Sequence, residues 1–479
     1  MTLRSLKKDR PEVFKAISGA ALVPVMALVS VPLFAAQDAG QPVQSDASQV
    51  SPDLPRAAAQ SDASQSPTVE PGEVFGPPDD RPVIVAPQGV PLSLAEGVHA
   101  AVSTFPRVRA ALLNIKARQS DIKAAKRRRL PSASVQALSF AGGNSIAGTD
   151  PFALNFVVDQ PIWNGGRIGG QIDRANTALT VSEARAVEVA ESVAIQSINS
   201  YFEAVLAKRR LEKLEGSRGI LQELVATIKR RVDQQVSPNS DLVLAESRLA
   251  EIEQQITFAQ ASFYSARETY RQVTGLYNYD FVDMPTYDRL TMHPASTGLV
   301  EEAIQCNPTT RVAAAERELA GVDTDLAKSQ LYPQLSAQYS LNEITGSRFG
   351  LVVTAQLQNG LSQFSVVDSS RTRELELEAE TEAAGLDGRL RVTNDLLLNY
   401  SSRDQVPIGM RSVAAAAEVT ASYRRQFIAG RRSWLDVVNA VREQVTADLF
   451  LVDSETSAMA SHARIQIYSC RWVPVIESP

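Results

Sequence analysis

Two short breaks between long helical patterns carry the side chains most able to control the passage of ions. Asp241 follows the break Ser-Pro-Asn-Ser at 237–240, and Arg432 and Asp436 stand on either side of a second break near Ser433. In a symmetric oligomer each such side chain becomes a ring, and rings of charge in a narrow pore select ions and solutes. The simpler alternative is that these residues cap helices and face water, as charged residues usually do.

Enzymatic chemistry is not indicated anywhere in the chain. The three histidines, at 99, 293 and 462, are scattered and leave little for acid–base catalysis or metal binding. The glycine-rich stretch 165–170 precedes a helix but lacks the Gly-Lys-Ser/Thr ending of a phosphate-binding loop. We therefore expect no catalytic residues, no cofactor and no metal site, and we interpret this stretch as a joint between a strand and a helix.

The composition favours long helices with thin hydrophobic seams over a row of compact domains. Of 479 residues only 6% are aromatic, a low share for proteins with thick hydrophobic cores. The net charge of −6 and the pI near 5.4 give no sign of nucleic-acid binding. A mainly α-helical protein is expected.

The N-terminal residues 1–36 have the pattern of a secretory signal peptide. A basic start is followed by the uncharged stretch 16–34 and by Ala35–Ala36, which is the order of an export signal; a short membrane anchor is the alternative. Residues 37–91 are rich in Pro, Ser, Ala and Asp and contain QSDASQ twice, so a disordered linker is expected there. No later uncharged apolar run reaches the roughly 18 residues of a transmembrane helix.

Cys306 and Cys470 are the only two cysteines of the chain. An exported protein enters an oxidising compartment, where a pair of cysteines tends to form a disulfide. The pairing requires that the two Cα atoms come within about 7 Å of each other. The chain thus offers one candidate disulfide, and two unpaired buried thiols are the alternative.

The chain after the linker consists of two copies of one unit. Leu130–Pro131 and Tyr332–Pro333 stand 202 positions apart, while Asn164–Gly165 and Asn359–Gly360 stand 195 apart. Two copies of a unit too thin to bury a core alone indicate a repeat architecture. The expected copies are residues 92–296 and residues 297–471, followed by a C-terminal tail at 472–479.

Each copy contains two segments in which apolar and polar residues alternate, as in half-buried strands. Strands of about ten residues with this alternation suit a transmembrane β-barrel, and a soluble sandwich is the alternative. Four strands cannot close a barrel, and open edges in lipid would cost several kcal/mol per unpaired backbone group. A barrel shared between chains is therefore expected. The expected strands are 132–141 and 151–160 in the first copy, and 334–342 and 348–358 in the second.

Long helices follow the strands in each copy. Apolar residues recur at alternating spacings of three and four from Leu211 to Val232, and again from Leu242 to Val273. This spacing predicts coiled-coil packing, and the short break between the two segments makes the pair antiparallel. The two hairpin tips are expected at 234–240 and 427–433, far from the strands.

These features together resemble the TolC family of outer-membrane channel proteins. The resemblance covers about 92–471 and is carried by the duplication, by Asn-Gly after the second strand, and by two tip motifs, RVDQQVSPNSDLVLAESRL (231–249) and YRRQFIAGRRSWLDVVNAVRE (423–443). It implies a homotrimer in which the strands of three chains close one transmembrane β-barrel of twelve strands in outer-membrane lipid. The long coiled-coil helices would form an α-helical tunnel across the periplasm.

The resemblance also implies roles for the tip residues. In the family, the second tip has a glycine, a basic residue and two acidic positions that constrict the periplasmic aperture; these correspond to Gly430, Arg432, Asp436 and the uncharged Asn439. Asp241 matches in the first copy. The residues expected to contact a periplasmic adaptor protein are Gln235, Val236, Ala429, Gly430 and Arg431.

The tips depart from the family at one position and also carry several basic residues. Gln235 stands where the family has glycine, and because only glycine freely supplies a positive φ in a tight turn, this weakens the expectation of an adaptor contact there. The neighbouring basic residues are expected to form a solvated or adaptor-facing patch. They are Arg230, Arg231, Arg424, Arg425 and Arg431.

The sequence thus predicts a passive exit duct in the outer membrane that extends into the periplasm and works with an adaptor and an inner-membrane transporter. Type I protein secretion with an ABC-type transporter is the first expectation, because the second tip is most similar to secretion members and no acylated cysteine is present. Multidrug efflux, with an RND-type transporter, is the alternative. A periplasmic coiled-coil scaffold is a more remote one.

Overall fold

The computed structural model describes residues 86–139, 152–281, 284–292, 298–342, 346–355 and 359–474. These residues belong to one unit that begins at Asp80. The expected signal peptide, residues 37–85 of the expected linker, His293 and the last five residues of the tail lie outside the described residues.

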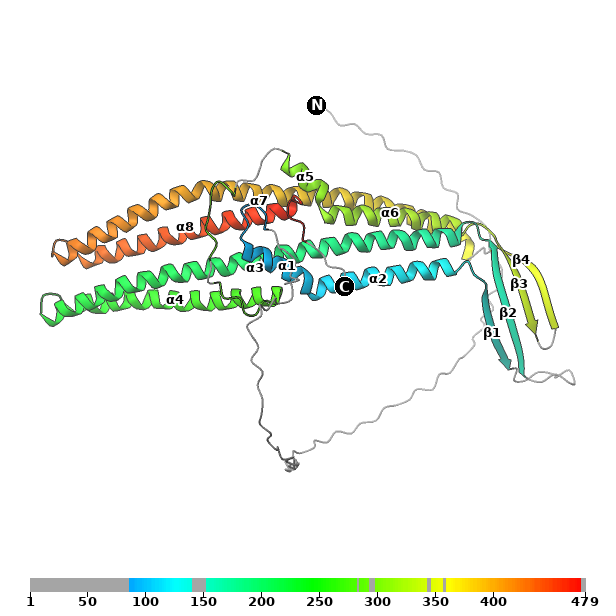
Figure 1. The fold of residues 1–479 in the computed structure, drawn as a ribbon, viewed down its shortest axis with the longest axis horizontal. Helices are drawn as coiled ribbons and strands as arrows, with labels where there is room; N and C mark the ends of the chain where they lie inside the picture. The colour runs from blue at the N-terminus through cyan, green and yellow to red at the C-terminus, as the bar shows by residue number, and fades with distance from the viewer. Residues whose placement is uncertain are drawn as a thin grey trace, which may run out of the picture. The chain divides into compact units, whose positions relative to one another are not determined.

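The same order of elements occurs in both copies (Figure 1). The first copy contains α1 (Leu92–Thr104), α2 (Pro106–Arg127), β1 (Ser132–Ser139), β2 (Phe152–Trp163), α3 (Arg167–Asp233) and α4 (Asn239–Thr274). The second contains α5 (Leu299–Cys306), α6 (Pro308–Ser329), β3 (Gln334–Asn342), β4 (Gly346–Thr354), the 3-10 turn η1 (Asn359–Leu361), α7 (Ser362–Ile428) and α8 (Trp434–Tyr468). The fold is mainly α with a small sheet.

Strand pairing moves three of the expected strand boundaries. β4 begins at Gly346 rather than at 348, because Gly346 pairs with Asn342, the last residue of β3. β2 continues past the expected end at 160, because Trp163 pairs with Leu335 across a bulge. β4 ends at Thr354 rather than at 358, because Thr354 pairs with Gln334, the first residue of its partner β3. Residues 140–141, 151 and 356–358 of the expected strands lie outside the described residues.

The four strands form one antiparallel sheet in the order β1-β2-β3-β4. The register places Val158, Tyr339 and Phe349 side by side, and it pairs Phe156 with Leu341. Residues two apart point to the same face, so these pairs build one apolar face, with polar residues such as Ser340 on the other. The apolar face is open: Phe349 is 77% exposed.

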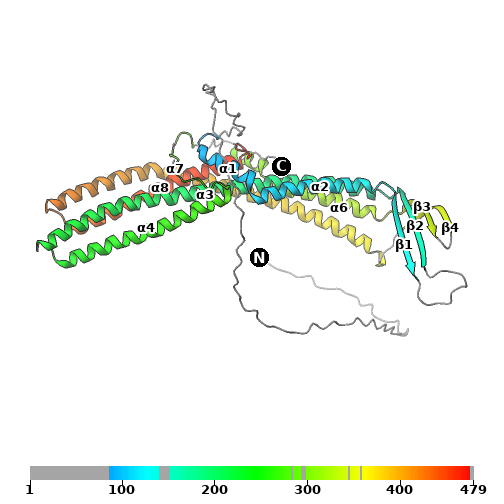
Figure 2. The same ribbon diagram turned by 60° about the horizontal axis from the view of Figure 1, so that its bottom comes forward.

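The helices form a layer that changes partners along its length (Figures 1 and 2). Near the sheet, α3 packs against α2 and α6; nearer the tips it packs against α4 and α8. α7 packs against α6 and then α8. α3 and α7 have 67 residues each, which at 1.5 Å per residue gives about 100 Å.

Hydrophobic seams hold these helices together. Leu211, Leu221 and Ile228 of α3 pack in one cluster with Ile252 of α4 and Val437 of α8. The three-and-four spacing read from the sequence is thus the buried side of each helix, as coiled-coil packing requires. None of the described helices has a stretch long and apolar enough to cross a membrane.

A disulfide joins Cys306, at the end of α5, to Cys470, two residues after α8. Their Cα atoms lie 6.1 Å apart, within the range that a disulfide spans. The link ties the start of the second copy to its last helix.

Candidate functional site: the hairpin tips

The two hairpin tips are built by the same backbone turn. At the end of α3, the amides of Gln235 and Val236 donate to the carbonyls of Val232 and Arg231, at 2.8 Å each. At the end of α7, the amides of Gly430 and Arg431 donate in the same pattern to Phe427 and Gln426, at 3.0 and 2.9 Å. Both turns are Schellman motifs, which end a helix through one residue in the left-handed conformation.

The helices that leave the tips begin differently. In the second copy the Ser433 hydroxyl accepts a hydrogen bond from the amide of Leu435 at 3.2 Å and caps α8. In the first copy Pro238 occupies the position before α4 and offers no such cap. Asp241 and Asp436 lie in the first turns of α4 and α8, where a negative charge is favourable beside the positive end of the helix dipole.

Arg432 is held in place by three contacts in its own hairpin. Its Nη1 lies 3.5 Å from Oδ2 of Asp436, and its Nε donates to the Oε1 of Gln426 at 3.4 Å. Its guanidinium also stacks over the Tyr423 ring, 3.9 Å from the centroid, a cation–π geometry. Asp436 therefore carries a charge that Arg432 partly neutralises.

The remaining tip residues expected to act at the aperture stand apart from this pair. Asn439 is exposed one turn further along α8. Among the described residues, no hydrogen bond or ion pair joins the Asp241 carboxylate to Arg432 or Asp436. Within one chain the structure thus brings two of the four candidate residues together and leaves the other two separate.

Arg231 and Arg424 belong to a link between the two hairpins, which corrects the expected surface patch. Arg231 of α3 donates from Nη2 to the carbonyl of Phe427 at 2.8 Å and stacks on its ring, 4.2 Å from the centroid. Arg424 of α7 forms an ion pair with Glu223 of α3. No sequence pattern indicates these contacts, because they join residues about 200 positions apart. Arg230, Arg425 and Arg431 remain exposed.

The outermost residues of the tips face solvent. Gln235, Val236, Ala429, Gly430 and Arg431 are all exposed, and the apolar Val236 is 70% exposed. Beneath the rim of the second tip, Phe427, Trp434 and Val437 are buried and form a packed base. A packed base under an exposed rim is suited to docking against another protein without rearrangement.

The glycine-rich stretch at 165–170 is the joint between β2 and α3. Gly165 and Gly166 have φ values of 60° and 87°, and a Cβ on Gly165 would lie 2.4 Å from the Cβ of Tyr332. α3 begins at the next residue. Among the described residues, no group of three or more His, Cys, Asp and Glu could hold a metal ion.

Comparison with known proteins agrees with this architecture. No protein-family model matches the chain. CzcC of Cupriavidus metallidurans, a cobalt-zinc-cadmium resistance protein, is 23% identical over 292 residues, which is 59% of this chain and 68% of the relative. CusC superposes with a TM-score of 0.69 at 16% identity, over 82% of this chain and 99% of that structure. The outer-membrane protein VceC of Vibrio cholerae gives 0.67 at 15%, over 80% and 97%.

The chain therefore has the fold of the TolC-like outer-membrane channels. The resemblance found in the tip motifs and in the duplication is confirmed at the level of the fold, and so is the expected combination of long helices with a four-stranded sheet. Among the solved structures with this fold, CusC is described as forming a transmembrane channel and CmeC of Campylobacter jejuni as an outer-membrane channel.

Proposed function

We propose that the protein is the outer-membrane channel of an export system, active as a homotrimer that extends into the periplasm. The observation that carries this proposal is that both the sheet and the helical layer of one chain have open edges. Its sheet has two open edges, at β1 and β4, and its helical layer also has an edge helix, α7, which packs on α6 and α8.

The edge helix carries a row of exposed apolar residues that needs a partner. Apolar residues spaced eleven positions apart along α7 are exposed. Eleven residues complete three turns at about 3.67 residues per turn, so these residues lie in a row along one side of the helix. The row consists of Phe364, Leu375, Leu386, Leu397, Ile408 and Val419. Such a stripe on a soluble surface marks an interface.

The opposite edge of the layer offers apolar residues that could receive this row. Leu113 of α2, and Val243 and Phe258 of α4, are exposed. A neighbouring chain that places its α7 against α2 and α4 would bring its β4 beside β1. Repetition of this contact around an axis closes both layers, since a head-to-tail interface forms a ring when its rotation closes. Three chains with twelve strands would remove every open edge.

The sheet supports an outer-membrane location for the closed barrel. Its exposed apolar face, which includes Val135, Leu154 and Phe349, would contact lipid, while the polar face would line the lumen. The exposed rims of the tips would then lie at the other end of a periplasmic tunnel and contact an adaptor protein. This adaptor would link the channel to an inner-membrane transporter of the RND or ABC type.

Efflux of small solutes is the transport that we place first. Its support is the similarity to CzcC, which is described as a metal-resistance protein. Type I protein secretion is the second candidate, because the second tip, GRRSWLDVVNA at 430–440, is most similar to secretion members of the TolC family.

Two experiments test these proposals in turn. The purified protein should migrate as a heat-sensitive trimer and produce stepwise conductance in planar bilayers; a monomer without conductance would refute the channel. Deletion of the gene should then increase sensitivity to drugs or metal ions without changing the secreted proteins. The loss of one secreted protein with unchanged sensitivity would favour type I secretion instead.

A further inference from the structure

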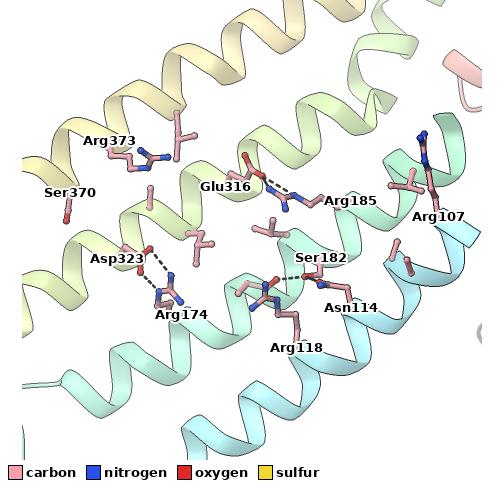
Figure 3. A pocket seen from close by; sticks show the side chains of 18 residues that line it. Arg107, Asn114, Arg118, Arg174, Ser182, Arg185, Glu316, Asp323, Ser370 and Arg373 are labelled. Atoms are coloured by element: carbon pink, nitrogen blue, oxygen red, sulfur yellow. Dashed lines mark hydrogen bonds and ion pairs between the residues drawn. The ribbon is translucent and has the colours of Figure 1, made fainter. Parts of the chain in front are cut away.

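A cavity of about 800 Å³ lies between α2, α3, α6 and α7, far along the helices from the hairpin tips (Figure 3). Arginine side chains dominate its charged lining. They are Arg107 and Arg118 of α2, Arg174 and Arg185 of α3, and Arg373 of α7. The acidic residues that line it are Glu316 and Asp323 of α6. Positive charges thus outnumber negative ones in a protein whose net charge is −6.

The two acids account for two of the arginines. Arg174 bonds through Nη2 to the Oδ2 of Asp323 at 3.4 Å, and the Nε of Arg185 donates to the Oε1 of Glu316 at 3.1 Å. Figure 3 shows both guanidinium groups directed from α3 towards α6. These pairs connect the two central helices of the cavity and leave Arg107, Arg118 and Arg373 without an acid inside it.

Arg118 and Arg373 are held only by weak pairs outside the cavity. Arg118 lies 3.3 Å from Asp121, and Arg373 lies 3.8 Å from Glu376, each partner being three residues further along the same helix. Exposed pairs of this kind contribute at most about 1 kcal/mol. Among the described residues, Arg107 forms no ion pair. A ligand could therefore bind these guanidinium groups with little loss of existing ion-pair energy.

The rest of the cavity is apolar or already paired. The Ser182 hydroxyl donates to the Oδ1 of Asn114 at 3.0 Å, so these two polar groups of the cavity lining are already hydrogen-bonded to each other. The Ser370 hydroxyl donates to the carbonyl of Val366 at 3.0 Å. Small and aliphatic side chains provide the rest of the lining: Ala110, Ala111, Ala178, Val181, Val189, Leu319, Ala320 and Leu377. The volume falls within the range of about 300–1,000 Å³ typical of small-molecule sites.

We propose that this cavity binds a compact anion in which two or more carboxylate or phosphate groups surround an apolar body. Guanidinium groups form paired hydrogen bonds with such groups, and Arg118 and Arg373 would approach the ligand from opposite sides of the apolar surface. The proposal concerns this chain's own binding surface and holds whether or not the protein transports solutes.

The test is calorimetric titration of the purified full-length protein in detergent with benzene-1,2,4,5-tetracarboxylate. Saturable binding at one site per chain is expected, weakening as salt rises because exposed charges are screened. Arg118→Gln and Arg373→Gln should each lower the affinity about tenfold. The matched control is Arg248→Gln, which removes an exposed arginine of α4 that pairs with Glu251 at 3.0 Å and lies outside the cavity.

The outcomes separate the parts of the proposal. The uncharged tetramethyl ester should not bind; equal binding of the ester, or no loss in Arg118→Gln and Arg373→Gln, would overturn the anion site. Inorganic pyrophosphate should bind more weakly than the aromatic acid, and equal affinity would overturn the role of the apolar surface. The absence of binding to the unmodified protein would overturn the whole proposal, and none of these results depends on conductance.

Discussion

Gln235 and Gly430 occupy equivalent positions in the two hairpin tips and adopt the same left-handed conformation, with φ values of 61° and 71°. Each ends its helix with the same pair of backbone hydrogen bonds. For a residue with a Cβ this conformation costs roughly 1–2 kcal/mol, whereas glycine adopts it freely. The first tip therefore keeps the shape of the second although its residue opposes that shape.

Replacement of Gln235 by glycine should stabilise the first tip. Gln235→Gly is expected to slow hydrogen exchange at the amides of Val236 and Ser237, corresponding to about 1 kcal/mol. Gly430→Ala should accelerate exchange at the second tip by a similar amount. Unchanged exchange in both variants would mean that the tips relieve the strain in another way.

The ion pair between Arg432 and Asp436 gives opposite predictions for its two members. If Asp436 lines the aperture, Asp436→Ala should raise single-channel conductance and weaken block by divalent cations. Arg432→Ala should strengthen that block, because it leaves the Asp436 carboxylate without its partner at 3.5 Å. Asn439→Asp should also strengthen it. Bilayer recordings with magnesium provide the measurement, and identical block in all three variants would remove these residues from the aperture.

Charges placed in the apolar row of α7 should prevent assembly. Leu386→Glu combined with Leu397→Glu would bury two carboxylates at the proposed interface, which costs several kcal/mol per chain. Light scattering of the purified protein should then report a monomer. The control is Leu290→Glu, which changes an exposed leucine that lies outside the row and should leave a trimer.

The raised pKa of Glu191 in α3 should make the folding stability depend on pH. Burial raises the pKa of its carboxyl from 4.5 to about 7; Arg391 lowers the pKa and Glu188 raises it. Between these pH values the unfolded chain releases a proton that the folded chain retains, so folding stability falls as the pH rises from about 4.5 to 7.

The variant Glu191→Gln removes this effect. It should raise the thermal midpoint at pH 8, by an amount equivalent to about 1–3 kcal/mol, and should change little at pH 4, where both states are protonated. Glu203→Gln, at an exposed position of the same helix, is the control. An equal change at both pH values would point to packing rather than to ionisation.

The disulfide between Cys306 and Cys470 should stabilise the second copy. It closes a loop with a sequence separation of 164 residues, and loops of this length gain about 5 kcal/mol in the chain-entropy model. Reducing agent should therefore lower the thermal midpoint of the native protein and leave the variant with both cysteines changed to serine unaffected. Two labelled thiols per chain in denatured, unreduced protein would exclude the bond.

The sequence by itself determined those features that depend on local periodicity. The alternation in Gln334–Leu341, the three-and-four seam of Leu211–Val232 and the breaks at the tips each reflect a regular element in which neighbouring residues fix the pattern. The duplication extended the same interpretation to the second copy. Strand ends were less well determined, because Thr354 and Trp163 end or extend a strand according to the partner strand.

Only the tertiary structure decided which distant residues meet. The approach of Cys306 to Cys470, the contact of Arg231 with Phe427 and the arginine cavity that joins Arg118 to Arg373 all depend on how long helices pack side by side. The left-handed conformation of Gln235 also had to come from the structure, since the backbone hydrogen bonds of the turn outweigh the residue's own preference. Local patterns specify elements, whereas contacts across hundreds of residues follow from the packing of whole helices.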